Sequence, residues 1–160
     1  MRLSDRKQAI RQHLEATRAT LLNAVAGLAP EDWNRPVASS EGAWTVKQAL
    51  AHLAAAESGQ LATGQRMLTG EARLGEGFNL DVWNQRQVAK RKDRAPADLL
   101  NDMIASRQQL LAWIEGLAEA DLDKSGQHAR GDMITVEQLC FRIGEHEVQH
   151  AAEIRQALGK

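Results

Sequence analysis

Residues 18–32 read RATLLNAVAGLAPED, and residues 107–121 repeat much of this stretch as RQQLLAWIEGLAEAD. Both copies keep an arginine, a Leu-Leu pair, a Gly-Leu-Ala segment and an aspartate at matching positions. From residue 5 to residue 28 the apolar residues recur at spacings of three, four and seven, which predicts one apolar stripe of an amphipathic helix. We interpret the two copies as one helical hairpin used twice, since each half needs the other to bury its stripe. The alternative is that unrelated helix ends reuse the same residue types.

Each copy leads into a stretch that reads Thr-Val-x-Gln, first at Thr45 and again at Thr135. This pattern is a capping box, in which the threonine hydroxyl accepts a hydrogen bond from a first-turn amide and the glutamine reaches back. We therefore predict one helix from Thr45 to about residue 67 and another from Thr135 almost to the C-terminus. Between them, residues 80–92 read as a short helix, and Pro96 begins a longer one that ends near Gly116.

The segment between the two halves decides the predicted topology. Residues 71–91 are long for a link between adjacent antiparallel helices and fit a crossover along the bundle. The sequence therefore predicts an all-α four-helix bundle with up-down-down-up topology and a short extra helix in the crossover. The halves span about residues 1–70 and 92–160 and form a single domain, residues 1–160. Aromatic residues make up only 4% of the chain, which argues against a sheet-rich fold.

Charge and cysteine content limit the function classes. The chain has 20 Lys and Arg against 21 Asp and Glu, a net charge of −1, so it lacks the positive field that holds nucleic acid. The start of the chain is charged where a signal peptide is apolar, and the best apolar run, residues 49–56, is short and interrupted by His52. The single Cys140 excludes an internal disulfide and suits a reducing compartment. We expect a cytoplasmic protein that binds neither nucleic acid nor membrane.

Three of the five histidines are expected to form a metal site. His146 and His150 are four residues apart on the predicted last helix, so both rings project from one face. His52 lies seven residues past its helix cap, and antiparallel packing of the two helices brings it level with the pair. Three neutral imidazoles without a fourth protein ligand are the pattern of an open, catalytic site. Zinc is the expected ion, although histidine ligands also suit nickel, iron and copper.

Other residues are candidates for the same site. The helix face around His52, which includes Gln48 and Gly59, is small or polar and leaves room for an ion with its water or substrate; close helix packing is the alternative. Arg142 and Glu153 lie within about 40° of His146 around the helix axis. We expect them to contact an anionic substrate or to orient a ligand ring, unless they form a solvated charge pair.

Residues 146–150 also match His-Glu-x-x-His, the zinc-peptidase motif. We do not predict a peptidase, because only ten residues follow, none of them is histidine, and no strand is evident that would align a peptide. Glu147 remains a candidate general base if its carboxylate reaches a metal-bound water. His128, in the polar loop 125–132, is expected to be solvated rather than to reach the mouth of the cavity.

Three segments of the chain carry a family resemblance. They are Trp44-Thr45-Val46-Lys47-Gln48-Ala49-Leu50-Ala51-His52-Leu53, Asn79-Leu80-Asp81-Val82-Trp83-Asn84 and Glu145-His146-Glu147-x-x-His150-x-x-Glu153-Ile154. Together they resemble the DinB-like, or YfiT-like, family of metal-binding four-helix bundles, and the resemblance covers nearly the whole chain. It implies that His52, His146 and His150 hold a divalent ion such as zinc or nickel, and that the protein is a homodimer.

The resemblance also implies an activity. Some members of this family are transferases or isomerases that use low-molecular-weight thiols such as bacillithiol or mycothiol. By analogy, the metal here binds a thiol as thiolate, which attacks a small electrophilic substrate held beside Arg142 or Gln48. Arg142 and Glu147 are then the candidate catalytic residues, and Gln48 and Glu153 the candidate cofactor-binding residues. A metal-water hydrolase is the alternative enzyme, and a non-catalytic bundle that acts through a partner is the alternative of another class.

Overall fold

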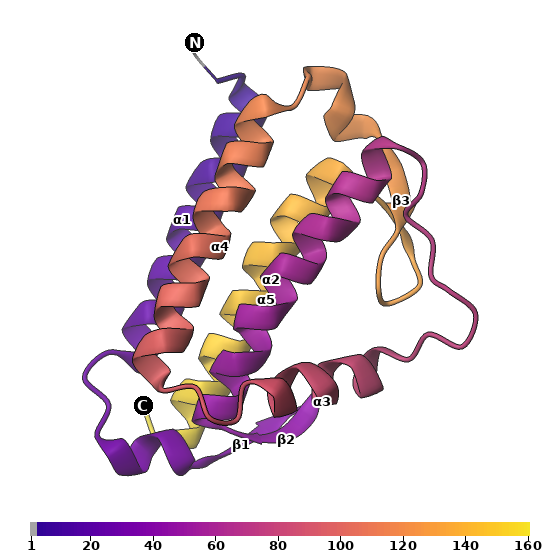
Figure 1. Cartoon of the computed structure of the whole chain (residues 1–160). Helices are drawn as coiled ribbons and strands as arrows, with labels where there is room; N and C mark the ends of the chain where they lie inside the picture. Colours follow the sequence, from indigo (N-terminus) through magenta and orange to yellow (C-terminus); the bar gives the residue numbers. More distant parts are fainter. Residues whose placement is uncertain (1–2) are drawn as a thin grey trace.

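Four long helices make up most of the computed structural model, which describes residues 3–160. They are α1 (Asp5–Val25), α2 (Val46–Leu68), α4 (Pro96–Gly116) and α5 (Val136–Ala157), and a shorter helix, α3 (Leu80–Lys90), lies between α2 and α4 in the chain. In Figure 1, α1 and α5 run in one direction while α2 and α4 run in the other. The predicted up-down-down-up bundle, with a short helix in its crossover, is therefore confirmed. None of the helices within residues 3–160 is both long enough and apolar enough to cross a membrane.

The capping residues begin the helices where the sequence predicts. Thr45 Oγ1 accepts a hydrogen bond from the Gln48 amide at 3.2 Å, and Gln48 Oε1 accepts one from the Thr45 amide at 2.9 Å. Thr135 and Gln138 make the same pair of bonds, at 3.1 Å to the threonine hydroxyl and 2.9 Å to the glutamine oxygen. α1 ends at Val25 rather than at residue 28, because Gly27 takes the left-handed φ of +66° that stops a helix.

Two short β-hairpins accompany the helices of this mostly helical fold. β1 (Pro36–Ser39) pairs with β2 (Gly42–Thr45), and β3 (Ser125–Gln127) pairs with β4 (Met133–Thr135), both antiparallel. Strands of three or four residues are too short for an alternating pattern to stand out in a sequence. The second strand of each hairpin ends at the threonine that caps the following helix, so the hairpin turn lies at the opposite end of its strands from that cap.

The same order of elements occurs in both halves: a long helix, a 3-10 turn, a hairpin and a second long helix. The 3-10 turns are η1 (Pro30–Asn34) and η2 (Glu119–Asp123). In both turns an aspartate side chain, Asp32 or Asp121, accepts a hydrogen bond from the backbone amide three residues earlier. The repeated sequence thus forms repeated local structure, and the descent of both halves from one hairpin stays a prediction.

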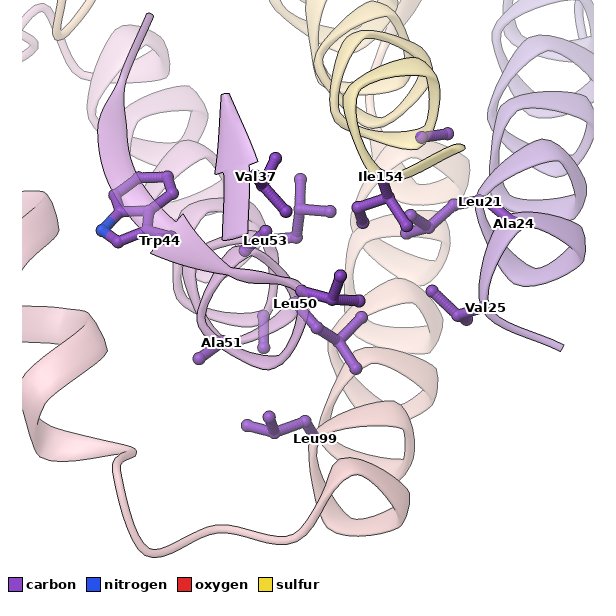
Figure 2. Packing of buried hydrophobic residues seen from close by; sticks show 14 of the residues in the cluster. Leu21, Ala24, Val25, Val37, Trp44, Leu50, Ala51, Leu53, Leu99 and Ile154 are labelled. Atoms are coloured by element: carbon purple, nitrogen blue, oxygen red, sulfur yellow. The ribbon is translucent and has the colours of Figure 1, made fainter. Parts of the chain in front are cut away.

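Buried apolar side chains form two clusters, one toward each end of the bundle. Figure 2 shows the cluster at the end where α2 begins, which includes Leu21, Val37, Trp44, Leu50, Leu53, Leu99 and Ile154. The opposite cluster includes Leu14, Met67, Leu110, Leu139 and Ile143. Fully burying one such side chain contributes about 1.5–3 kcal/mol, so these two clusters hold the four helices together.

A layer of charged side chains separates the two apolar clusters. Each long helix contributes one residue to it, and we call the set of Arg18, Glu57, Arg107 and Glu147 the ionic cluster. Arg18 lies 3.1 Å from Glu57 and 2.8 Å from Glu147, and Arg107 lies 2.7 and 3.0 Å from the same two carboxylates. All four residues are buried, and their two positive and two negative charges compensate each other inside the bundle.

Candidate metal centre

The antiparallel pair α2 and α5 brings the three predicted histidines together. His52 Nε2 lies 3.2 Å from His146 Nε2, which lies 3.0 Å from His150 Nε2. His52 and His150 are buried, whereas His146 is partly exposed. The arrangement expected from the sequence, with a histidine pair on one face of α5 opposite His52 on α2, is therefore present in the fold.

Glu41, at the turn of the first hairpin, joins these histidines and is not predicted by the sequence. Its Oε2 lies 2.9 Å from the Nε2 atom of each of the three rings. We call Glu41, His52, His146 and His150 the metal cluster. The one signal in the sequence is the tripeptide Ser40-Glu41-Gly42, which is typical of a turn and precedes the helix cap, but many loops contain such a tripeptide.

The donor atoms of the metal cluster have the spacing that a small divalent ion requires. Zinc held tetrahedrally at about 2.0–2.1 Å has neighbouring ligand atoms about 3.3 Å apart. The distances between the Nε2 atoms and Glu41 Oε2, 2.9 to 3.2 Å, are close to that value. Imidazole nitrogen suits zinc, nickel and iron alike. Cys140 does not take part, because it lies in the apolar core, where burial raises the pKa of its thiol to about 12.

Glu153 fixes the orientation of one histidine ring. Its Oε2 accepts a hydrogen bond from His150 Nδ1 at 2.8 Å, which leaves the lone pair of Nε2 directed at the metal cluster. Of the two roles predicted for Glu153, orienting a ligand ring agrees with this position. Contact with a cofactor does not, because Glu153 is not among the residues that line the neighbouring pocket.

Trp44 holds both His52 and the turn that carries Glu41. The indole packs against the His52 ring with 4.5 Å between ring centroids. The indole also lies against Gly42, where an added Cβ would clash with the indole ring atoms. A larger residue at position 42 would therefore push Trp44 and the turn apart.

The surroundings favour the protonation states that bind a metal. Burial disfavours the ionised form of Glu41, but hydrogen bonds donated by Nε2 protons of His146, His150 and His52 outweigh it and hold the pKa of the carboxyl well below its usual range. A metal ion would take the place of these ring protons. Burial lowers the pKa of His52, so its neutral form is favoured near pH 7. A carboxylate and neutral imidazoles are the forms in which these side chains coordinate a metal ion.

A pocket of about 570 Å³ opens beside the metal cluster, with Glu41, His52 and His146 in its lining. Its walls include the α2 residues Ala56 and Gly59, the crossover residues Phe78 and Trp83, and four arginines, Arg66, Arg73, Arg130 and Arg142. An added Cβ at Gly59 would lie 3.2 Å from Trp83, so the small residues of α2 make room for the crossover as well as for the pocket. The pocket lining thus combines apolar side chains with four arginines and two glutamates, Glu41 and Glu71.

Two predicted site residues lie elsewhere. The Glu147 carboxylate accepts hydrogen bonds from Arg18 and Arg107 in the ionic cluster, at 2.8 and 3.0 Å, so its position contradicts a role as general base at the metal. Gln48 is exposed, and its side-chain oxygen is used in the cap of α2. Arg142 does line the pocket, and it forms a salt bridge with Asp132 at 2.8 Å rather than with Glu153. Its catalytic role stays a prediction.

His128 is buried in the pocket wall rather than solvated, which corrects the expectation for its loop. Its Nδ1 accepts a hydrogen bond from the Arg130 amide at 3.2 Å, which assigns the ring proton to Nε2. Burial, together with the charge of Arg142, lowers the pKa of His128 to about 4. A neutral imidazole with an N–H group therefore lies beside the metal cluster at neutral pH.

Comparisons with known proteins agree with the fold. The sequence profile of the DinB superfamily matches residues 9–154. YfiT from Bacillus subtilis, a probable metal-dependent hydrolase with an unusual four-helix bundle topology, is 22% identical and has a TM-score of 0.74 over 99% of this chain and 91% of its own. Colibactin self-resistance protein ClbS, solved with double-stranded DNA, is 15% identical with a TM-score of 0.77 over 96% of each chain.

A third structure of the same fold is the mycothiol-dependent maleylpyruvate isomerase. It is 14% identical, with a TM-score of 0.73 over 91% of this chain and 60% of the isomerase. No curated protein matches the sequence significantly. At these identities the likeness to solved structures establishes the fold.

Proposed function

Because this chain belongs to the DinB superfamily, we propose that it is a divalent-metal-dependent enzyme whose ion is held by His52, His146 and His150. The observation that carries the proposal is the convergence of three imidazole nitrogens and one carboxylate oxygen at the wall of a pocket. Closed structural zinc sites are usually rich in cysteine, whereas histidine sites beside a cavity are typical of catalysis. Zinc is the ion we expect first, with nickel and iron as alternatives.

The charge balance of the metal cluster supports a cation. An ionised carboxylate and lone pairs on neutral imidazoles repel one another at 2.9 to 3.2 Å unless a proton or a metal ion lies between them. The guanidinium of Arg130 reaches only the other carboxylate oxygen, Oε1. A divalent ion among the four donor atoms would balance the cluster without moving any helix.

When bound, such an ion lowers the pKa of a coordinated water or thiol and so supplies a nucleophile near neutral pH. The chain itself supplies orientation and binding. Glu153 keeps His150 in one tautomer, and Arg142 offers a positive charge to an anionic group in the pocket. The neutral His128 offers a hydrogen-bond donor to a polar atom of the substrate.

Within this class we favour a transferase or isomerase that uses a low-molecular-weight thiol. A volume of about 570 Å³ is ample for a small molecule. The mycothiol-dependent isomerase has the same fold, and its description supports the favoured reaction class. YfiT is described as a probable metal-dependent hydrolase, which supports the alternative, metal-water hydrolysis. A small-molecule substrate also suits a net charge of −1 better than DNA does, although ClbS was solved with DNA. A cytoplasmic homodimer remains part of the proposal.

Metal analysis and a substrate panel test the proposal. The protein is purified without a histidine tag from metal-replete medium, and metal is counted per chain for wild type, His52→Ala and the control His13→Ala. His13 lies outside the metal cluster and bonds the Phe141 carbonyl. We expect one ion per chain in wild type and in the control, and loss of the ion in His52→Ala.

Turnover is then measured with several thiols and a set of electrophiles, and separately with ester and amide substrates. Metal-dependent turnover with a thiol supports the favoured reaction, and turnover without one supports the hydrolase. Wild-type protein that holds no stoichiometric ion contradicts the metal site. A protein that holds the ion but turns over nothing in either set favours a non-catalytic bundle that acts through a partner.

A further inference from the structure

We propose that Glu41 is a fourth protein ligand that closes the metal site at rest, and that Arg130 positions its carboxylate. This inference rests on the proposed function, since it needs an ion at the three histidines. It differs from the open site expected for three histidines alone, because an incoming ligand must first displace Glu41.

The position of Glu41 is that of a metal ligand rather than of a residue that only orients one histidine ring. Its Oε2 is 2.9 Å from each Nε2 atom, so it is equidistant from all three imidazoles. A carboxylate that only oriented one ring would approach the other nitrogen of that ring, as Glu153 approaches His150 Nδ1. The side chain of Glu41 is 13% exposed, so water has little access to compete for it.

The first hairpin is built to hold Glu41 over the histidines. Ser39 Oγ accepts a hydrogen bond from the Glu41 amide at 3.1 Å, which fixes the turn. Gly42 and Trp44 pack together behind it, and Trp44 in turn lies on the His52 ring. Glu41 and His52 are therefore parts of one packed unit, although eleven residues separate them in the sequence.

Arg130 ties the second hairpin to the first at the same carboxylate. Its Nη2 donates a hydrogen bond to Glu41 Oε1 at 2.5 Å, so each oxygen of the carboxylate has its own partner. The guanidinium draws negative charge toward Oε1, which weakens Oε2 as a donor and makes it easier to displace. A displaced carboxylate keeps its bond to Arg130 and stays in the pocket, because both residues line it.

Cobalt(II) is the probe for this arrangement, because its visible absorption is strong in four-coordinate sites and weakens as ligands are added. The full-length protein is loaded with cobalt(II), and azide, a small anionic ligand, is titrated into wild type, Glu41→Ala, Glu41→Gln and Arg130→Ala. Glu145→Gln is the matched control, since it removes a carboxylate next to His146 that is exposed and outside the metal cluster. Circular dichroism checks that each variant is folded.

We expect wild type to show a four-coordinate spectrum and to bind azide weakly. Glu41→Ala should bind azide at least about 10-fold more tightly and hold cobalt at least about 10-fold more weakly in competition with a chelator. Glu41→Gln should bind cobalt with intermediate affinity, because an amide oxygen is a weaker ligand. Arg130→Ala should shift azide affinity in the opposite direction, toward weaker binding, because Oε2 then keeps more negative charge and is harder to displace. The same change should add nothing in the double variant with Glu41→Ala.

Two results separate this inference from the proposed function. If wild type and Glu41→Ala bind cobalt and azide equally while His52→Ala does not bind cobalt, the histidine site stands and Glu41 is not a ligand. If wild type itself binds no cobalt, the proposed function fails first. A shift in Glu145→Gln as large as that in Glu41→Ala would mean that local charge, rather than coordination, sets the affinity.

Discussion

The ionic cluster and the metal cluster lie on the same two helices, with Glu147 of the first between His146 and His150 of the second in the sequence. In the ionic cluster two carboxylates meet two guanidinium groups, so the charges balance within the protein. In the metal cluster one carboxylate meets three imidazoles, of which burial lowers the pKa of His52, and a proton or a metal ion has to lie between the donor atoms. The ionic cluster thus balances its charges with protein groups alone, although Glu147 Oε2 is buried with no hydrogen-bond partner among the described residues. We propose that the metal cluster is balanced by an ion.

Symmetry also separates the two clusters. Arg18 and Arg107 hold matching positions in the repeated sequence, and each bonds both carboxylates of the ionic cluster. Each also donates to a backbone carbonyl of the other's helix, Arg18 to Met103 and Arg107 to Leu14. The ionic cluster thus uses both halves alike, which suits a role in joining them.

The metal cluster, in contrast, breaks the repeat. Seven residues after the helix cap stands His52 in one half and Arg142 in the other. Each pairs with a carboxylate on the turn of its own hairpin, His52 with Glu41 and Arg142 with Asp132. The same scaffold therefore carries a salt bridge in one half and a residue of the metal cluster in the other, and the function that we propose depends on this difference.

The largest effect that tests this contrast is expected in the ionic cluster. Glu147→Ala leaves Arg18 and Arg107 with one carboxylate between them in a buried layer, and breaking a buried ion pair in this way costs about 3–5 kcal/mol. We expect that loss in the free energy of unfolding, measured with urea in the presence of a chelator. Glu145→Ala, at an exposed neighbouring position, should change it by less than about 0.5 kcal/mol. A stable Glu147→Ala protein that has lost its metal would place Glu147 in the metal cluster after all.

A smaller effect tests the buried imidazole beside the metal cluster through pH. The pKa of His128 is about 4 in the folded protein and about 6.5 in an unfolded chain. Between those values the unfolded chain binds a proton that the folded protein does not, so stability falls as the pH drops through this range. For His128 alone the loss at pH 5 relative to pH 8 is about 2 kcal/mol.

His128→Gln keeps a hydrogen-bond donor and removes this titration, so its stability should depend less on pH between 8 and 5. Urea unfolding of metal-free wild type and variant at several pH values measures the difference. His52 contributes in the same direction, because burial lowers its pKa too, and it remains in both proteins. Parallel pH profiles for the two proteins would show that His128 is protonated in the folded state well above pH 4.

Local signals explain how much of the molecule could be predicted from its sequence. Capping boxes, apolar spacing and the long crossover encode the helix bounds and the topology, and helix geometry alone carries His52 to His146 and His150. Glu41 could not be found in this way, because it depends on a hairpin of four-residue strands and on packing between Gly42 and Trp44. Contacts of that kind form only in the folded chain.

The motif His-Glu-x-x-His misleads for a related reason. Around the helix axis Glu147 lies about 100° from His146 and about 60° from His150, so helix spacing alone does not exclude it from their face. Its true partners, Arg18 and Arg107, lie on other helices. The sequence shows Arg18 and Arg107 at matching positions of the two repeats. No local pattern indicates which acidic residue these arginines bind.

The smallest effect is expected from the counterpart of Glu41 in the second half. Asp132 bonds Arg142 with both carboxylate oxygens, at 3.0 and 2.8 Å, but it is 49% exposed and outside the metal cluster. Because exposed ion pairs contribute about 0–1 kcal/mol, Asp132→Asn should lower stability by less than 1 kcal/mol and leave cobalt affinity unchanged. Chelator competition and urea unfolding, run beside Glu41→Gln, measure both quantities. If Asp132→Asn weakens cobalt binding as much as Glu41→Gln does, the hairpin carboxylates act through charge in both halves, and the difference between the halves would lie in the histidines alone.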